Sequence, residues 1–399
     1  MNSPGAVLIA CLSIYFALSV TNIPPLLVLC PLLFSGLFLL MDSPPVSESE
    51  RKNADLPSLY TIGLFIFAYV LSVIFSADLT KSINAMAVLF PGMLIAYVLC
   101  QVPTASVHYL SWGLSVLVLS ASCLTICLFL FSSTSNPSLV FQDYSAPSLV
   151  VPNDMLVGVV FLPFAIDTVL YEKRLIPRVL ALGAMLALII AVLMVGSRAC
   201  MLSLLFLLTV YLFFLFRQQF LVCLTIGLLL IYLADFFFKL GIVENFLLLR
   251  HENARLSVWL AGLMHWSEHP LLGLGPSNFE VAYRQGMSTL TLPDWMMIDF
   301  RSVPWAHNLY IEALVERGIV GLITLLLLLE LIGSRIYSHM SVSTGRLARF
   351  YFAVFASFSG FLFAGLFELT LQRIWVANAL FIFLGIAFAP HESTKDMRE

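Results

Sequence analysis

Long apolar runs, separated by short polar segments, form the dominant pattern of this chain. Each run is close to the roughly 20 residues that an α-helix needs to cross a hydrocarbon core of about 30 Å. The pattern therefore predicts an all-α, polytopic integral membrane protein with about twelve transmembrane helices. The predicted spans lie near residues 5–21, 24–41, 58–77, 82–100, 109–131, 153–170, 178–195, 200–216, 220–238, 309–332, 348–368 and 374–389.

The distribution of cations predicts which side each loop faces, because cytoplasmic loops are enriched in Lys and Arg. One set of loops holds eleven of them, whereas the short loops of the other set hold only Lys81, Arg198 and Arg373. Both termini are therefore expected in the cytoplasm. The chain then divides into spans one to nine (1–238), one long outward loop with short amphipathic helices (239–308), and spans ten to twelve with a short cytoplasmic tail (309–399).

The amino-acid composition supports a membrane protein and excludes several other classes of protein. Hydrophobic residues make up 60% of the chain and charged residues 11%, against roughly 25% charged in an average soluble protein. The net charge of −3, without any basic run, excludes a nucleic-acid-binding protein. All seven cysteines lie in or beside apolar runs, so neither a disulfide framework nor a CxxC metal site is predicted.

Polar chemistry is concentrated in the outward loop, which contains four of the seven histidines. Apolar residues recur at helical spacing over 252–266 and predict an amphipathic helix on the membrane face. The glycines and prolines of 270–276 predict a tight turn, followed by a short helix. His265 and His269 have i,i+4 spacing, but neither an HExxH motif nor a carboxylate-rich third ligand accompanies them, so no metal site is predicted.

Three segments, in order, resemble the signature of bacterial O-antigen ligases and the related O-antigen polymerases. They are RLSVW (255–259), HPLLGLGPSNF (269–279) and AHNLYIEALVERGIVGL (306–322). The turn GSRA (196–199) and the twelve-span layout are similar to the same family. The resemblance implies a membrane glycosyltransferase whose site faces the periplasm, and it also points to an outward cation near span four and an acid near the end of span eleven.

No nucleotide-binding motif occurs in the chain, so the energy for a transfer has to arrive within the substrate, and an undecaprenyl-diphosphate-linked glycan fits this requirement. Arg198 and Arg255 are the predicted catalytic cations, because arginines stabilise the negative charge that builds up on a departing diphosphate. His307 is the predicted base for the acceptor hydroxyl. Arginine alone meets the diphosphate charge, so no metal or other cofactor is expected.

A second group of residues is predicted to bind substrate. Charged groups at outward span ends are costly unless they are paired or functional, and other members of the group lie in the outward loop or where it re-enters the membrane. This group consists of Lys81, Arg250, Arg301, Asn308, Glu312, Glu368 and Arg373. Structural roles stay open for several of them, since Asn308 also suits a helix N-cap and Glu312 a helix start, while the cations suit snorkelling or pairing.

The function predicted from these features is that of an O-antigen ligase in the bacterial inner membrane. It would transfer a polysaccharide from undecaprenyl diphosphate to lipid A–core, with inversion and without a metal. An O-antigen polymerase or a protein O-oligosaccharyltransferase of the same family remains an alternative. A twelve-span transporter or flippase is a third hypothesis, although its midplane ionisable residues are not evident here.

Overall fold

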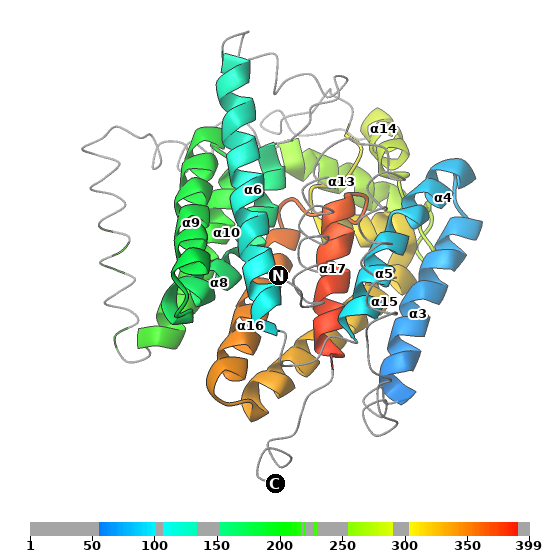
Figure 1. The fold of residues 1–399 in the computed structure, drawn as a ribbon. Helices are drawn as coiled ribbons and strands as arrows, with labels where there is room; N and C mark the ends of the chain where they lie inside the picture. Colours follow the sequence, from blue (N-terminus) through cyan, green and yellow to red (C-terminus); the bar gives the residue numbers. More distant parts are fainter. Residues whose placement is uncertain are drawn as a thin grey trace.

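The computed structural model describes residues 56–100, 107–133, 152–216, 254–289 and 303–389, together with 219, 225, 227 and 229. All regular elements among these residues are helices (Figure 1). They are α3 (Leu56–Ile74), α4 (Leu79–Ala87), α5 (Leu89–Leu99), α6 (Val107–Ser133), the 3₁₀ helix η3 (Pro152–Met155), α8 (Leu156–Tyr171), α9 (Leu175–Val195), α10 (Arg198–Phe216), α13 (Ala254–Trp266), α14 (Phe279–Thr289), α15 (Leu309–Val342), α16 (Gly345–Gly365) and α17 (Ile374–Ala387).

Nine of the twelve predicted spans fall on described residues, and each coincides with a helix or, for 82–100, with the pair α4 and α5. Within this part of the chain, six helical segments are long and apolar enough to cross a membrane, and α8, α10 and α17 are shorter apolar helices. The predicted spans 5–21, 24–41 and 220–238 lie outside the described residues. The all-helical class is confirmed, whereas the total of twelve spans stays a prediction.

Burial separates inner from outer helices. The shorter helix α8 is buried along almost its whole length, and so is α17, because other helices surround a segment that is apolar on every side. The helices α6, α9 and α16 pack around α8, and α17 packs against α5. In contrast, α3 and α9 expose rows of leucine, isoleucine and phenylalanine. An apolar surface of this kind suits contact with lipid rather than with water.

Helix α15 is broken at Gly318, whose φ of +66° is not helical. The break frees backbone groups on both sides, and the loop 270–275 satisfies them. Leu274 and Gly275 donate to the carbonyls of residues 315 and 316, while the N–H groups of residues 319 and 320 donate to carbonyls of the loop. A chain inside a membrane has to satisfy such groups internally, so the turn predicted at 270–276 serves as a partner for a discontinuous helix.

Glycines permit this close approach. A Cβ on Gly273 would lie 2.6 Å from the backbone nitrogen of Arg317, and one on Gly275 would lie 2.8 Å from the Cα of Ser76. Both glycines have positive φ angles. The hydroxyl of Ser72 on α3 adds bonds to the carbonyls of Leu272 and Glu316, each 3.0 Å long. The 270–275 loop is therefore fixed to both α3 and α15.

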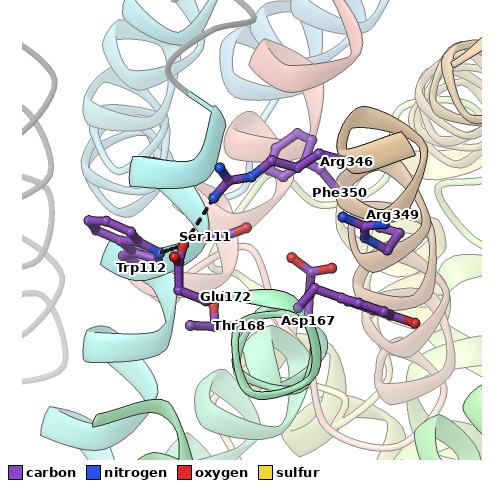
Figure 2. Close-up of a pocket in the computed structure, with 9 residues that line it drawn as sticks. Ser111, Trp112, Asp167, Thr168, Glu172, Arg346, Arg349 and Phe350 are labelled. Atoms are coloured by element: carbon purple, nitrogen blue, oxygen red, sulfur yellow. Dashed lines mark hydrogen bonds and ion pairs between the residues drawn. The ribbon is translucent and has the colours of Figure 1, made fainter. Parts of the chain in front are cut away.

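A polar cluster joins the ends of α6, α8 and α16 (Figure 2). Glu172, after α8, accepts hydrogen bonds from Trp112 Nε1 on α6 (3.1 Å) and from Arg346 Nη2 on α16 (3.0 Å). The guanidinium of Arg349 stacks on the ring of Tyr171 at 4.4 Å. These contacts join three helices at the end where the sequence predicted a cytoplasmic loop.

Replacing Gly318 by alanine is expected to destabilise the protein by more than about 1 kcal/mol, since the position has a left-handed φ and the new Cβ would overlap the carbonyl of Leu271. The measurement is the thermal unfolding midpoint of the purified protein in detergent. Gly63→Ala is the matched control, because Gly63 is helical and no atom lies within 4 Å of the place that its Cβ would occupy. Equal midpoints for the two variants would contradict the role assigned to the break.

Candidate active site

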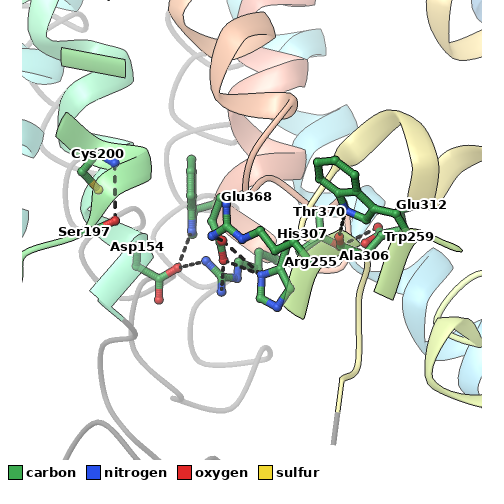
Figure 3. Close-up of polar contacts among 12 residues, drawn as sticks. Asp154, Ser197, Cys200, Arg255, Trp259, Ala306, His307, Glu312, Glu368 and Thr370 are labelled. Atoms are coloured by element: carbon green, nitrogen blue, oxygen red, sulfur yellow. Dashed lines mark hydrogen bonds and ion pairs between the residues drawn. The ribbon is translucent and has the colours of Figure 1, made fainter. Parts of the chain in front are cut away.

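The carboxylate of Glu368 is the centre of a buried ionic cluster (Figure 3). Glu368 lies in the connection between α16 and α17, and its side chain is 0% exposed. His307 Nδ1 lies 3.0 Å from Oε1 and 3.1 Å from Oε2. Arg255 Nη2 donates to Oε2 at 2.9 Å, and Arg373 Nη2 lies 3.6 Å from Oε1. One carboxylate thus contacts three basic side chains from α13, from the 303–308 segment and from the start of α17.

These neighbours keep Glu368 ionised. Burial by itself raises the pKa of this carboxyl, but the hydrogen bond and charge of His307, followed by the charges of Arg373 and Arg255, lower the pKa below its ordinary value. An ionised carboxylate only accepts hydrogen bonds, so Nδ1 of His307 carries the proton that it donates. The other ring nitrogen, Nε2, is then the one that holds a lone pair in neutral His307.

A second acid holds Arg373 in place. Arg373 Nη1 donates to Asp154 Oδ1 at 2.8 Å, and Trp375 Nε1 donates to the same oxygen at 2.9 Å. The ring of Trp305 covers the guanidinium at 4.8 Å. Only 10% of the Arg373 side chain is exposed. Arg373 is therefore a buried link between two carboxylates, whereas Arg255 has 38% of its side chain exposed and retains N–H groups for an external anion.

The backbone around His307 is unusual. Its φ is +52°, a left-handed value that is uncommon for a residue other than glycine. The neighbours on both sides are fixed, because Trp259 Nε1 donates to the carbonyl of Ala306 at 2.8 Å and Asn308 Nδ2 donates to the carbonyl of Leu366 at 3.0 Å. Such backbone strain persists only where surrounding contacts determine it, and it is frequent at active sites.

Two further buried acids, Glu312 and Glu316, lie in the first two turns of α15. Glu312 accepts from the Thr370 hydroxyl at 2.6 Å, and Glu316 accepts from the backbone N–H of Phe279 at 3.1 Å and from Gln372 Nε2 at 2.9 Å. Both acids are almost fully buried. They connect α15 to the 370–372 segment and to the start of α14. Glu312 also lies in the first turn of α15, as the alternative of a helix-start role expects, and its role in substrate binding stays a prediction.

The structure brings together four residues that the sequence singled out, namely Arg255, His307, Glu368 and Arg373. Asn308 also lies beside them, but it is the N-cap of α15, with its oxygen accepting from two backbone N–H groups. Lys81 is exposed in the first turn of α4 and forms no part of the Glu368 cluster. Arg250 and Arg301 lie outside the described residues.

Arg198, the remaining predicted catalytic cation, is half-buried at the first residue of α10. It follows Gly196, whose φ of +66° turns the chain between α9 and α10. Two residues further on, Cys200 lies in the first turn of α10, and α10 packs against η3, which contains Asp154. The turn that carries Arg198 is therefore next to the ionic cluster.

Sequence reasoning missed Asp154 as a member of the site. Asp154 lies at the outward end of a predicted span, directly before the apolar run that becomes α8. The criterion that selected Glu368, an ionisable group at an outward span end, applies to it equally well. Its partners, Arg373 and Trp375, follow more than 200 residues later, and only the fold brings them to it.

Comparison with known proteins adds one finding. Residues 182–326 match the family model described as O-antigen ligase. The match covers about a third of the chain and includes Arg198, Arg255 and His307, whereas Asp154, Glu368 and Arg373 lie outside it. No curated protein matches the chain.

Replacing Glu368 by glutamine is expected to destabilise the protein by about 3 kcal/mol near neutral pH, because three buried or half-buried basic groups lose their counter-charge. Since the folded-state pKa lies below the ordinary value of 4.5, the stability that the carboxylate contributes is fully present above that pH. It is lost as the pH falls through the folded-state pKa.

The gap between wild type and Glu368→Gln in thermal unfolding midpoint should therefore be large at about pH 7 and should shrink at about pH 3.5. Glu280→Gln is the control, since Glu280 pairs with the exposed Arg284 within α14 and surface pairs contribute little. A gap that is constant across this pH range would disagree with an ionised, stabilising Glu368.

Proposed function

We propose that this chain, whose residues 182–326 match the O-antigen ligase family model, is a ligase that joins a lipid-diphosphate-linked polysaccharide to lipid A–core. The observation that carries the proposal is the arrangement around Glu368, where one buried carboxylate holds both a histidine and an accessible arginine. A base and an anion-binding group thus lie side by side, as a transfer from a diphosphate to a hydroxyl requires.

In this proposal His307 is the general base. Glu368 holds Nδ1–H and leaves Nε2 to take the proton of the acceptor hydroxyl as that oxygen attacks the anomeric carbon. The imidazolium that forms is then stabilised by the buried carboxylate, as in other acid–histidine pairs. His307 has 20% of its side chain exposed, so part of the imidazole is open to an acceptor sugar.

Arg255 would bind the diphosphate. One nitrogen is used by Glu368, and guanidinium has five N–H donors, so the exposed part of the side chain remains for the phosphate oxygens. As the bond between the sugar and phosphate breaks, negative charge increases on the diphosphate and the arginine stabilises it. Arg198, at the adjacent α9–α10 turn, is the second cation proposed for this role. Attack and departure on opposite faces of the sugar would give inversion in one step.

The sidedness of the proposal rests on the charges at the two ends of the helices. The site lies where α16 ends and α15 and α17 begin. At the other end, Lys173, Arg174, Arg346 and Arg349 flank the α8–α9 and α15–α16 turns. A cation-rich end is typical of the cytoplasmic side. These charges support the proposal that the site faces the periplasm from the bacterial inner membrane, where a lipid-linked donor and lipid A–core would both be accessible.

His307→Ala should lower the rate of glycan transfer by roughly 10²- to 10⁴-fold, the usual contribution of a general base. Arg255→Ala should lower it by about 10²- to 10³-fold, through weaker stabilisation of the leaving group. The assay uses the purified protein in detergent with a lipid-diphosphate-linked glycan and lipid A–core, without an ion gradient. Arg284→Ala, at an exposed position on α14, is the matched arginine control and should transfer normally.

If His307→Ala inserts normally and transfers as fast as wild type, the proposed mechanism is wrong. If the wild-type protein instead transports the donor across proteoliposome membranes and transfers no glycan from the donor to the acceptor, the transporter hypothesis is favoured.

Deletion of the protein separates a ligase from the polymerase of the same family. Loss of a ligase leaves lipid A–core without any O-antigen unit, because nothing reaches the core. Loss of a polymerase leaves a single unit on the core, because ligation still proceeds. Gel analysis of lipopolysaccharide from a deletion strain is expected to give the bare core. A strain that carries one unit on each core would replace the ligase proposal with the polymerase.

A further inference from the structure

Two histidines and a glutamate gather at the C-terminal end of α13, away from the Glu368 cluster. The ligand atoms of His265, Glu268 and His269 all lie within 4.8 Å of one another. The sequence argument against a metal site was that a third ligand beside the two histidines was missing. The structure supplies Glu268 in that position, with Oε2 at 2.8 Å from His265 Nδ1.

The backbone holds these three side chains together. Helix α13 ends at Trp266, and the chain continues in tight turns in which Glu268 N–H donates to the carbonyl of His265 at 3.2 Å and His269 N–H to that of Trp266 at 2.9 Å. Residues at i, i+3 and i+4 therefore share one side of the turn. The His265 and His269 rings meet edge to face, with centroids 5.7 Å apart.

The chain that follows is rigid as well. Gly273 N–H donates to the carbonyl of His269 at 3.1 Å, and the 270–275 loop is bonded to the broken helix α15. His265, in the last turn of α13, and His269, directly before the 270–275 loop, thus have backbones held by hydrogen bonds. A site whose backbone is already ordered loses little conformational entropy when an ion binds.

We propose that His265, Glu268 and His269 bind one divalent transition-metal ion of the zinc type. Two imidazole nitrogens and one carboxylate oxygen suit Zn²⁺, Co²⁺ or Ni²⁺, whereas Ca²⁺ and Mg²⁺ prefer oxygen ligands alone. Zinc bonds of about 2.0–2.2 Å to these atoms require small side-chain rotations from the present separations. The ion would replace the proton shared by His265 and Glu268.

The exposed fractions of the three side chains are consistent with a metal site that is open on one side. The His265 side chain is 11% exposed and forms the fixed inner ligand, while that of Glu268 is 64% exposed and His269 is also exposed. Three protein ligands leave a coordination position for water on the open side. The ion would connect the end of α13 to the start of the 270–275 loop. This role is structural and independent of the transfer reaction proposed above.

The test uses the full chain in detergent, carrying an affinity tag without histidines and treated with a chelator. Titration with Co²⁺ alone is expected to give one equivalent bound, with the visible absorption of a low-symmetry Co²⁺ site, and Zn²⁺ should displace it and raise the thermal unfolding midpoint. His269→Ala and Glu268→Gln, both at exposed positions, should lose this equivalent and the thermal shift. Glu280→Gln, a carboxylate elsewhere on the outward loop, should retain them.

Metal binding and thermal shift at the wild-type level in both His269→Ala and Glu268→Gln would overturn the proposal, as would the absence of a bound equivalent in the wild type. Loss of glycan transfer has no bearing on this outcome, because the readouts are metal stoichiometry and thermal stability. Failure of the metal proposal can therefore be distinguished from failure of the proposed function.

Discussion

The requirement that a buried charge be paired organises the end of this protein that contains the candidate site. Glu368 is fully buried, and an isolated carboxylate in that position would be strongly unfavourable. It is stabilised by basic groups from α13, the 303–308 segment and the start of α17, while Arg373 extends the chain of ion pairs to Asp154 in η3, directly before α8. The carboxylate thus fixes elements that are distant in sequence relative to one another, and the same pairing orients His307.

The break in α15 provides the second constraint. A continuous helix would satisfy its own backbone, but the interruption at Gly318 leaves groups that the 270–275 loop has to bind. Because that loop continues directly from α13, the break also positions the helix that carries Arg255. The described part of the 239–308 segment is therefore packed into the fold, and its contacts with α3 and α15 support the ionic cluster.

Several features followed from the sequence alone because they depend on local pattern. Apolar length predicted the nine helical segments that can be compared, and the glycines of 270–275 predicted the turn. The outward loop was expected to contain short helices, and α13 and α14 are such helices. The same reasoning, that charge inside or beside a membrane needs a reason, selected Arg255, His307, Glu368 and Arg373 before their contacts were known.

Only the tertiary structure decided how these residues act on one another. Glu368 is 113 residues from Arg255 and 61 from His307, and no periodic pattern relates positions so far apart. Asp154 was missed for this reason, and Glu268 was not recognised as the third group beside two histidines. The sequence determines which side chains are expensive to bury, because that cost is a property of each residue. Which partner compensates that cost depends on helix packing, which sequence spacing does not encode.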